Sequence, residues 1–250
     1  MSYKLECNKE FKKFKNILLD IKSIFSENLG TIHLARNELK VIKIQNIQTV
    51  VKAFRVPNLL NQFVYAYFRK SKAYKAFHNA TKLHELNVTT PEAIGYIEFF
   101  SLGFLKESFF ISKEFKYDFT IAHIRDAQPK YKERVLQDFA EFTYFIHKKG
   151  VWHVDYSGGN ILIRREDDKY IFSLVDINRM KFRSITGYEG LENFNKLWFN
   201  EEDLTTIAKI YSNIAKLDES KAISEILMHD KKLKDKVLLK RKLKGKWTKY

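Results

Sequence analysis

Hydrophobic residues near the start of the chain recur at helical spacing, with lysines between them. The apolar positions are Phe11, Phe14, Ile17, Leu18, Ile21, Ile24 and Phe25. This pattern predicts an amphipathic N-terminal helix that ends before Gly30. Such a helix either packs on a neighbouring part of the protein or lies on a membrane surface, and packing is the more common outcome.

The hydrophobic period changes after Gly30. Short segments rich in β-branched residues and separated by polar turns predict three strands, Thr31–Leu34, Lys40–Ile44 and Thr49–Phe54. Two helical patterns follow, Asn61–Arg69 and Ser71–Leu86, and the second has Ser71 to cap its start and Asn87 at its end. A hairpin is predicted next, with strands Ala93–Phe99 and Ser108–Glu114 around a turn at 101–103.

The second half of the chain is mostly helical in pattern. One predicted helix carries Val135, Phe139, Phe142 and Ile146 on a single face and ends at Gly150. The remaining predicted elements are a short hairpin, Ile161–Ile163 with Tyr170–Val175 turning at 166–168, and two further helices, Leu204–Ala215 and Ala222–Leu227. The strands therefore gather in the first half and the helices in the second, as in an α+β protein.

Composition agrees with a folded chain that has an uneven charge. The 250 residues are 45% hydrophobic and 15% aromatic, enough for one large domain or two packed lobes. The net charge is +15, and residues 231–250 contribute +9 of it, with ten Lys or Arg against one acid, Asp235. A basic tail of this kind binds anionic lipid or nucleic acid, or is simply solvated.

Cysteine usage and hydropathy favour a reducing compartment. Cys7 is the only cysteine, which excludes an internal disulfide and a cysteine-based metal site. No window approaches 18 consecutive apolar residues, and the N-terminus lacks the continuous apolar region of a secretory signal. We therefore expect a cytoplasmic protein, and the basic tail favours a position peripheral to the inner membrane.

The stretch His153-Val-Asp-Tyr-Ser-Gly-Gly-Asn160 is the strongest chemical signal in the chain. It has the H-x-D-x-x-x-x-N spacing of a kinase catalytic loop, and Asp176 follows 16 residues after Asn160. Asp155 is the predicted catalytic base, and Asn160 and Asp176 are the predicted Mg²⁺ ligands. His153 is expected to brace the loop through hydrogen bonds. The alternative is a surface turn, but that has to explain four residues in order between a helix and a hairpin.

Lys52 completes this constellation on the third predicted strand. Its side chain is expected opposite Val51, on the face that meets the α- and β-phosphates of ATP. Its partner is left open, because the helix that follows has His78 where an acid is expected and carries only Glu85. Either Glu85 serves, an acid comes from elsewhere, or the lysine is held differently.

The predicted order of strands, helix and hairpin is that of a kinase small lobe. Residues Glu114–Asp118 are expected to form the hinge, with Glu114 binding ATP. A glycine-rich phosphate loop is missing, and only the turn 35–38 lies between the first strands. The other histidines, His123 and His147, lack ligand spacing and are expected at the surface or hinge.

The chain resembles the lipopolysaccharide kinase family over roughly residues 10–215. The segments that carry the resemblance are 35–38, 50–54 with Pro57-Asn58, 71–73 leading to 86–92, and 152–162 with 175–180. Instead of the Asp-Phe-Gly of protein kinases the chain has Asp176-Ile-Asn178, and it lacks an Ala-Pro-Glu segment.

The resemblance implies a two-lobed protein-kinase-like fold, with a small β-rich N-lobe (1–113), a helical C-lobe (114–230) and a basic tail (231–250). It implies ATP and Mg²⁺ as cofactors, with Lys52, Asp155, Asn160 and Asp176 in the roles given above. It further implies phosphorylation of a Kdo or heptose hydroxyl of the lipopolysaccharide inner core on lipid A. That substrate lies at an anionic membrane surface, which the tail suits, and no nucleic acid is expected.

Three other functions stay open. The first is a small-molecule kinase of the aminoglycoside or choline type, which shares both aspartates and the asparagine but often has a larger helical acceptor subdomain. The second is a nucleic-acid-binding module that uses the basic tail and has no need of the three site residues. The third is a pseudokinase, which the missing helix glutamate and glycine loop suggest.

Overall fold

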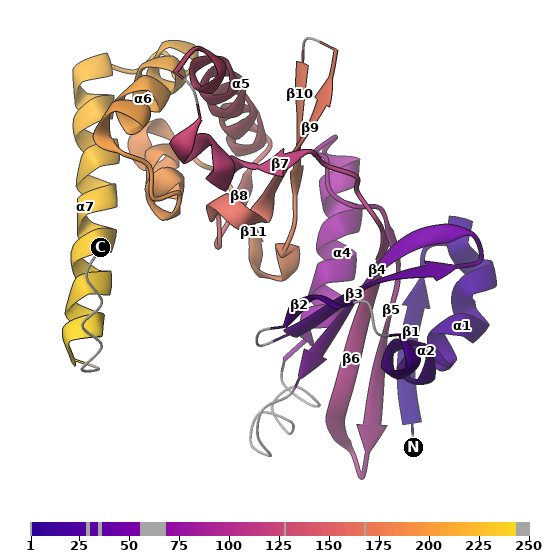
Figure 1. Ribbon diagram of the computed structural model, residues 1–250. Helices are drawn as coiled ribbons and strands as arrows, with labels where there is room; N and C mark the ends of the chain where they lie inside the picture. Colours follow the sequence, from indigo (N-terminus) through magenta and orange to yellow (C-terminus); the bar gives the residue numbers. More distant parts are fainter. Residues whose placement is uncertain are drawn as a thin grey trace. The chain divides into compact units, whose positions relative to one another are not determined.

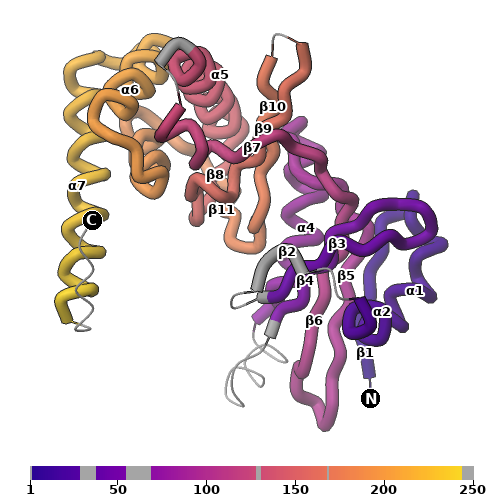
Figure 2. Tube along the Cα trace, in the orientation of Figure 1, coloured from indigo at the N-terminus to yellow at the C-terminus, as the bar shows by residue number. Residues whose placement is uncertain are grey.

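The computed structural model describes residues 2–28, 31–34, 37–55, 69–127, 129–167 and 169–243 (Figures 1 and 2). The chain divides into unit 1, which is Met1–Lys116 with Val175–Arg179, and unit 2, which is Tyr117–Leu174 with Met180–Tyr250. The predicted helix Asn61–Arg69, the turn 35–38, and Pro57, Asn58 and Trp247 lie wholly or partly outside the described residues.

The strands, α-helices and 3₁₀ helices (η) follow one another along the chain. Those of unit 1 are β1 (Ser2–Cys7), η1 (Lys9–Phe14), α1 (Lys15–Leu19), α2 (Ile21–Glu27), β2 (Thr31–Leu34), β3 (Asn37–Ile44), β4 (Ile47–Arg55), α4 (Lys72–Glu85), β5 (Ala93–Ser101), β6 (Phe104–Lys113) and η4 (Ile177–Arg179). Those of unit 2 are β7 (Phe119–Thr120), η2 (Ile121–Asp126), α5 (Pro129–Lys148), β8 (Val151–His153), η3 (Gly158–Asn160), β9 (Ile161–Glu166), β10 (Lys169–Leu174), β11 (Met180–Phe182), η5 (Gly187–Lys196), α6 (Glu201–Ala215) and α7 (Glu219–Leu243).

Unit 1 is built on a six-stranded antiparallel sheet with the order β1-β5-β6-β4-β3-β2. The three strands predicted after Gly30 are β2, β3 and β4, and the predicted hairpin is β5 with β6, so these predictions are confirmed. β1 was not predicted. It is an edge strand with the sequence Ser-Tyr-Lys-Leu-Glu-Cys, in which Tyr3, Leu5 and Cys7 alternate with polar residues, although only Leu5 and Cys7 are partly buried.

The N-terminal apolar stripe packs on one face of this sheet. Phe14, Leu18 and Ile21 are buried in a cluster with sheet residues such as Ile97 and Ile111. The stripe thus forms core rather than a membrane-lying face. The prediction of a single helix is wrong, however, because the segment is divided into η1, α1 and α2. The backbone leaves helical geometry at Phe11 (φ −110°, ψ 24°) and again at Asp20 (φ −94°, ψ 6°). Three short helical segments therefore pack on the sheet in place of one continuous helix.

Helix α4 packs on the opposite face of the sheet, where Phe77 contacts Tyr96 next to Ile97 on β5 (Figure 1). Both of its predicted ends are confirmed. The Ser71 hydroxyl caps the start by accepting from the Tyr74 N–H (3.0 Å). At the other end Asn87 has φ 57°, and the N–H of Val88 reaches back to the carbonyl of Leu83 (2.8 Å), as in a Schellman motif.

In unit 2 the long helix α5 leads directly into strand β8. The predicted face of this helix is confirmed, since Val135, Phe139 and Ile146 are buried. Gly150 ends it with φ 71°, and a side chain there would meet the carbonyl oxygen of Arg183 at 2.9 Å. The predicted hairpin after residue 160 is β9 with β10. Helix α5 packs on α6, and α6 packs on α7.

The last helix is longer than its sequence pattern indicates. The prediction Ala222–Leu227 is wrong in length, because α7 continues to Leu243 and includes the first part of the basic tail (Figure 1). Its buried face ends at Asp230, so beyond that point no apolar stripe marks a helix. Lysine, leucine and arginine are good helix formers, and this propensity accounts for the extension.

Candidate active site

Residues 153–160 fold into a loop that is held by its own hydrogen bonds. The N–H of Asp155 donates to His153 Nδ1 (3.1 Å), and the Asp155 carbonyl accepts from the N–H of Ser157 (2.8 Å) and from Asn160 Nδ2 (2.9 Å). His153 is fully buried and braces the loop in this way. The loop thus fixes the backbone of Asp155, while about a third of that side chain (36%) is exposed.

Tyr156 anchors this loop in the core of unit 2. Its side chain is fully buried, stacks on Phe139 (centroids 5.7 Å apart) and shares a hydrogen bond with Thr143 (2.8 Å). Burial raises the pKa of the Tyr156 phenol, which therefore stays neutral. A buried anchor directly after Asp155 limits movement of the loop.

Two side chains from η5 also reach the loop, and the sequence pattern did not reveal either. Asn193 Nδ2 donates to the carbonyl of His153 (3.0 Å). Lys196 Nζ donates to the next carbonyl, that of Val154 (2.6 Å), and lies 3.5 Å from Asp155 Oδ1. Asn193 and Lys196 are three residues apart, so they lie on one face of a 3₁₀ helix. This spacing becomes a signal only when the segment is known to be a 3₁₀ helix.

His147 supports Asn193 from helix α5. The expectation of a surface or hinge position is wrong for this residue, which is 3% exposed, whereas His123 is exposed as predicted. His147 Nε2 lies 3.1 Å from Asn193 Oδ1, and Nδ1 lies 2.9 Å from the Tyr211 hydroxyl. Burial lowers the pKa of His147 to about 4, so the ring is neutral at pH 7.

Unit 1 contains a second group of predicted site residues. Lys52 lies on β4 next to the buried Val51 and forms an ion pair with Asp176 Oδ1. Asn178 Nδ2 donates to the same oxygen (2.8 Å). Asp176 has φ 55°, a left-handed conformation that aspartate tolerates better than most residues. The open question about Lys52 thus has an answer in the structure, because an acid from elsewhere in the chain is its partner.

The two helix residues considered for Lys52 have other contacts. Glu85 Oε2 lies 3.4 Å from Lys82 on the exposed side of α4. His78 Nε2 lies 3.2 Å from Glu6 Oε2 on β1. Helix α4 still acts near the pair, because Asn79 Nδ2 donates to the carbonyl of Ile177 (2.6 Å), directly after Asp176.

Glu114 follows strand β6 at the end of the sheet. Its N–H donates to the carbonyl of Gln48 (2.8 Å), and the residue is half-buried. A backbone position next to the end of a sheet suits contact with a nucleotide base, but this role for Glu114 stays a prediction.

The predicted metal ligands are chemically suited to a hard divalent cation. Asn160 uses Nδ2 within the loop, which leaves its Oδ1 to coordinate, and Asp176 has a carboxylate that is 30% exposed. Among the described residues no three His, Cys, Asp or Glu side chains form a metal-binding group. An amide and a carboxylate fit a cation such as Mg²⁺, which keeps waters and takes further oxygens from phosphates.

Comparisons with known proteins indicate the family and the fold of the chain. A model of the lipopolysaccharide kinase (Kdo/WaaP) family matches residues 52–218, and no curated protein matches the chain. Among solved structures the chain is similar to WaaP in complex with acyl carrier protein, with a TM-score of 0.62 and 18% identity over 92% of this chain and 99% of that chain. It is also similar to the gentamicin-APH(2″)-IIa complex, with a TM-score of 0.52 and 12% identity over 86% of each chain. These likenesses confirm the predicted kinase-like fold.

Proposed function

Because the chain belongs to the lipopolysaccharide kinase (Kdo/WaaP) family, it is a phosphotransferase, and we propose that it transfers phosphate from Mg-ATP to a Kdo or heptose hydroxyl of the inner core on lipid A. The observation that carries this proposal is that Asp155 has a fixed backbone and a partly exposed side chain. Its backbone is fixed by the loop, while its carboxylate is partly exposed and so accessible to an acceptor hydroxyl. A carboxylate presented in this way suits a base that accepts a proton and holds the nucleophilic oxygen.

The other residues supply positioning and charge neutralisation, which is most of what phosphoryl transfer requires from a protein. We assign Lys52 on β4 to the phosphates of ATP, since its ammonium is held in place by Asp176. Asn160 and Asp176 would hold the divalent cation through oxygen atoms, and Glu114 would contact the base of ATP. When bound, the cation supplies charge neutralisation at the phosphate oxygens.

The transfer assay uses purified protein, Mg-ATP and a panel of acceptors. The panel contains Kdo-lipid A, a heptosylated core on lipid A, an aminoglycoside and choline, and mass spectrometry detects the added phosphate. Phosphate on a lipid A-linked sugar supports the proposal and identifies the sugar. If phosphate is added only to the aminoglycoside or choline, or to none of the compounds, the assignment of a lipid A-linked sugar as the acceptor is refuted.

Variants test the assigned base within the same assay. Asp155→Asn is expected to lower the transfer rate by about 10²- to 10⁴-fold, the usual contribution of a general base. The control is Asp167→Asn, because Asp167 is exposed in the β9–β10 turn with φ 51°, where asparagine fits equally well. Full activity in Asp155→Asn would refute the assignment of the base.

We further propose that the second half of α7 brings the enzyme to its lipid substrate. No helix among the described residues is long and apolar enough to cross a membrane. Residues 231–243 contain seven Lys or Arg and one acid, and Leu238, Leu239 and Leu243 are exposed, Leu239 by 59%. Basic residues contribute about 1 kcal/mol each near an anionic membrane, and exposed leucines add apolar contact.

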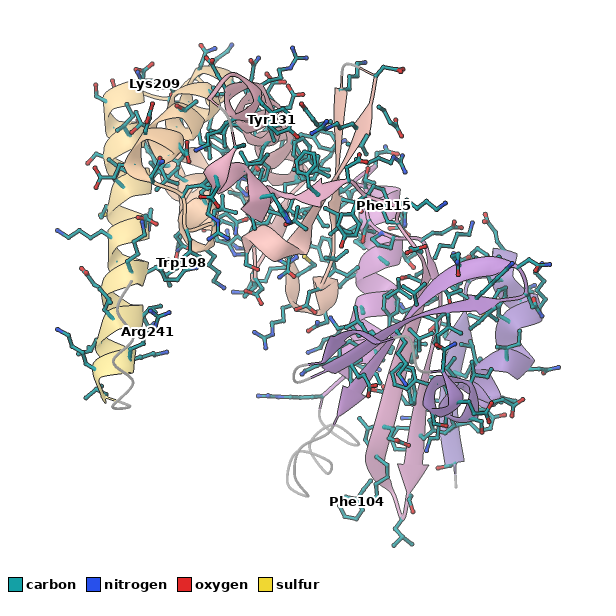
Figure 3. All side chains as sticks on the ribbon, in the orientation of Figure 1. Phe104, Phe115, Tyr131, Trp198, Lys209 and Arg241 are labelled. Carbon is teal, nitrogen blue, oxygen red and sulfur yellow. The ribbon has the colours of Figure 1, made fainter. Side chains whose placement is uncertain are left out.

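Flotation with anionic vesicles tests this second proposal. A variant with Lys236, Lys240 and Lys242 changed to Gln is expected to lose binding, whereas the control changes the exposed Lys148, Lys169 and Lys209 of unit 2 (Lys209 is labelled in Figure 3). Equal flotation of both variants would refute it. The WaaP structure contains acyl carrier protein, so acyl carrier protein is included as a competing ligand. Retention by acyl carrier protein without flotation would assign this surface to a protein instead.

A further inference from the structure

The 3₁₀ helix η5 presents one face to the catalytic loop. Residues three apart on a 3₁₀ helix lie above one another, so Gly190, Asn193 and Lys196 share that face. Asn193 and Lys196 donate to consecutive loop carbonyls, those of His153 and Val154. At Gly190 a side chain would come within 2.0 Å of the Tyr211 hydroxyl. Gly190 therefore lets η5 pack closely on Tyr211 and His147, while Asn193 and Lys196 hold the loop and the Lys196 ammonium lies beside Asp155.

The contacts of Lys196 leave part of its ammonium group available. The short contact is to the Val154 carbonyl (2.6 Å), while Asp155 Oδ1 is at 3.5 Å. An ammonium has three N–H donors, and within the described residues these two oxygens are the contacts of Nζ. The side chain is 35% exposed, and the ammonium has one more donor than these two contacts use. The carbonyl thus anchors the lysine, and both the third N–H and the Asp155 carboxylate stay accessible to a substrate.

The catalytic loop itself has no positive charge. Residues 153–160 contain no lysine or arginine, and their one acid is Asp155. Phosphoryl transfer spreads negative charge over the oxygens of the transferred group, and a fixed cation next to the base neutralises it. Lys196 is the cation that unit 2 brings to this loop from a distant part of the sequence.

We propose that Lys196 contacts the phosphoryl group while it is transferred, next to the base Asp155. This proposal rests on the proposed kinase function and adds a residue to it. In the step, the bond between the γ-phosphorus and the β–γ bridging oxygen breaks, and its electron pair leaves with ADP. The acceptor oxygen forms the new bond to phosphorus, and its proton passes to Asp155. Lys196 donates an N–H to a phosphoryl oxygen and keeps its own proton throughout.

Three substitutions separate this role from a purely structural one. Lys196→Met keeps the length of the side chain and removes its charge and donors. Lys196→Arg keeps both. Lys196→Ala opens space for an added small amine, and Lys209→Met, on helix α6, is the control for the loss of an exposed lysine. Thermal unfolding of every variant measures how much the hydrogen bond from Lys196 to the Val154 carbonyl contributes to stability.

Steady-state kinetics with varied Mg-ATP and a fixed, saturating acceptor measure kcat and KM for ATP. Lys196→Met should lower kcat by about 10²-fold, the usual cost of removing a donor that stabilises developing charge, and should leave KM for ATP within about threefold. Lys196→Arg should recover most of this loss, and ethylamine should raise the rate of Lys196→Ala. A kcat for Lys196→Met within about threefold of wild type would overturn the proposal. So would a loss that follows thermal stability and responds to neither arginine nor ethylamine.

Hydrolysis of ATP in the absence of any acceptor sugar separates the two proposals. If lipid A-linked sugars receive no phosphate but hydrolysis depends on Lys196, the acceptor is wrong and the role of Lys196 stands. If the sugar is phosphorylated equally by wild type and Lys196→Met, the function stands and the role of Lys196 is wrong.

Discussion

Replacing His147 with glutamine is expected to remove a large part of the pH dependence of stability of unit 2. Asn193 donates through Nδ2 to the His153 carbonyl, so its Oδ1 accepts from His147 Nε2–H. Nδ1 of the same ring then accepts from the Tyr211 hydroxyl. Glutamine also offers a donor and an acceptor on one side chain, and it does not titrate between pH 4 and 8.

The magnitude follows from the difference between the folded and unfolded pKa of His147. The pKa falls from 6.5 in the unfolded chain to about 4 in the folded protein. Because the folded pKa is lowered, the contribution is fully present above pH 6.5 and is lost as the pH falls toward 4. Between pH 7 and pH 5 the wild type should lose about 2 kcal/mol of unfolding free energy from this residue alone, and at most about 3 kcal/mol by pH 4. Against a total stability of about 5–15 kcal/mol this is readily measured.

Urea unfolding followed by tryptophan fluorescence is a suitable assay. Among the described residues both tryptophans, Trp152 and Trp198, belong to unit 2, and the Trp152 ring stacks on His147 (centroids 5.8 Å apart). The quantity to compare is the loss of stability between pH 7 and pH 5 in wild type and in His147→Gln. The exposed His123→Gln is the control and should behave as wild type does. Equal losses in wild type and His147→Gln would refute the assignment of a neutral, buried imidazole.

Three further substitutions have definite expected outcomes. Gly190→Ala should lower the unfolding free energy in urea by about 1–3 kcal/mol, because its Cβ would lie 2.0 Å from the Tyr211 hydroxyl. The control is Gly159→Ala, which should cost far less because nothing lies within 4 Å of its Cβ. Equal costs for the two variants would contradict close packing at Gly190. Ser71→Ala should destabilise α4 by about 1 kcal/mol through loss of its cap, and unchanged stability would show that the cap is not needed. Lys52→Met should lower phosphate transfer by about 10²-fold, and wild-type rates would remove it from the site.

Much of unit 1 could be predicted because its signals are local. β4, β5 and β6 have β-branched and aromatic residues in short runs between turns, and α4 carries its own start and stop residues, Ser71 and Asn87. β1 has no β-branched residue, and the alternation of Tyr3, Leu5 and Cys7 with polar residues is its one local signal. The N-terminal segment shows the opposite problem. Its helical period is genuine, but the backbone leaves helical geometry at Phe11 and Asp20 while the apolar side chains pack on the sheet, and periodicity does not report such bends.

The candidate site divides in the same way. The residues in the loop could be identified because His153, Asp155 and Asn160 lie within eight positions. Lys196 could not, since it reaches the loop from 41 residues away and is one of many lysines. The partner of Lys52 lies 124 residues away, and no local pattern connects Asp176 with the strand that carries the lysine, so the sequence left this pair open.

Helix α4 is linked to Lys52 through other residues, although it carries no glutamate where one was expected. At that turn His78 faces Glu6, while the next residue, Asn79, donates to the carbonyl of Ile177. This bond fixes the backbone directly after Asp176, whose carboxylate holds the Lys52 ammonium. The helix therefore orients the lysine through the acid that follows β10 rather than by contacting it. A missing helix glutamate is thus weak evidence for a pseudokinase in this chain, because the lysine still has a charged partner and that partner is still linked to the helix.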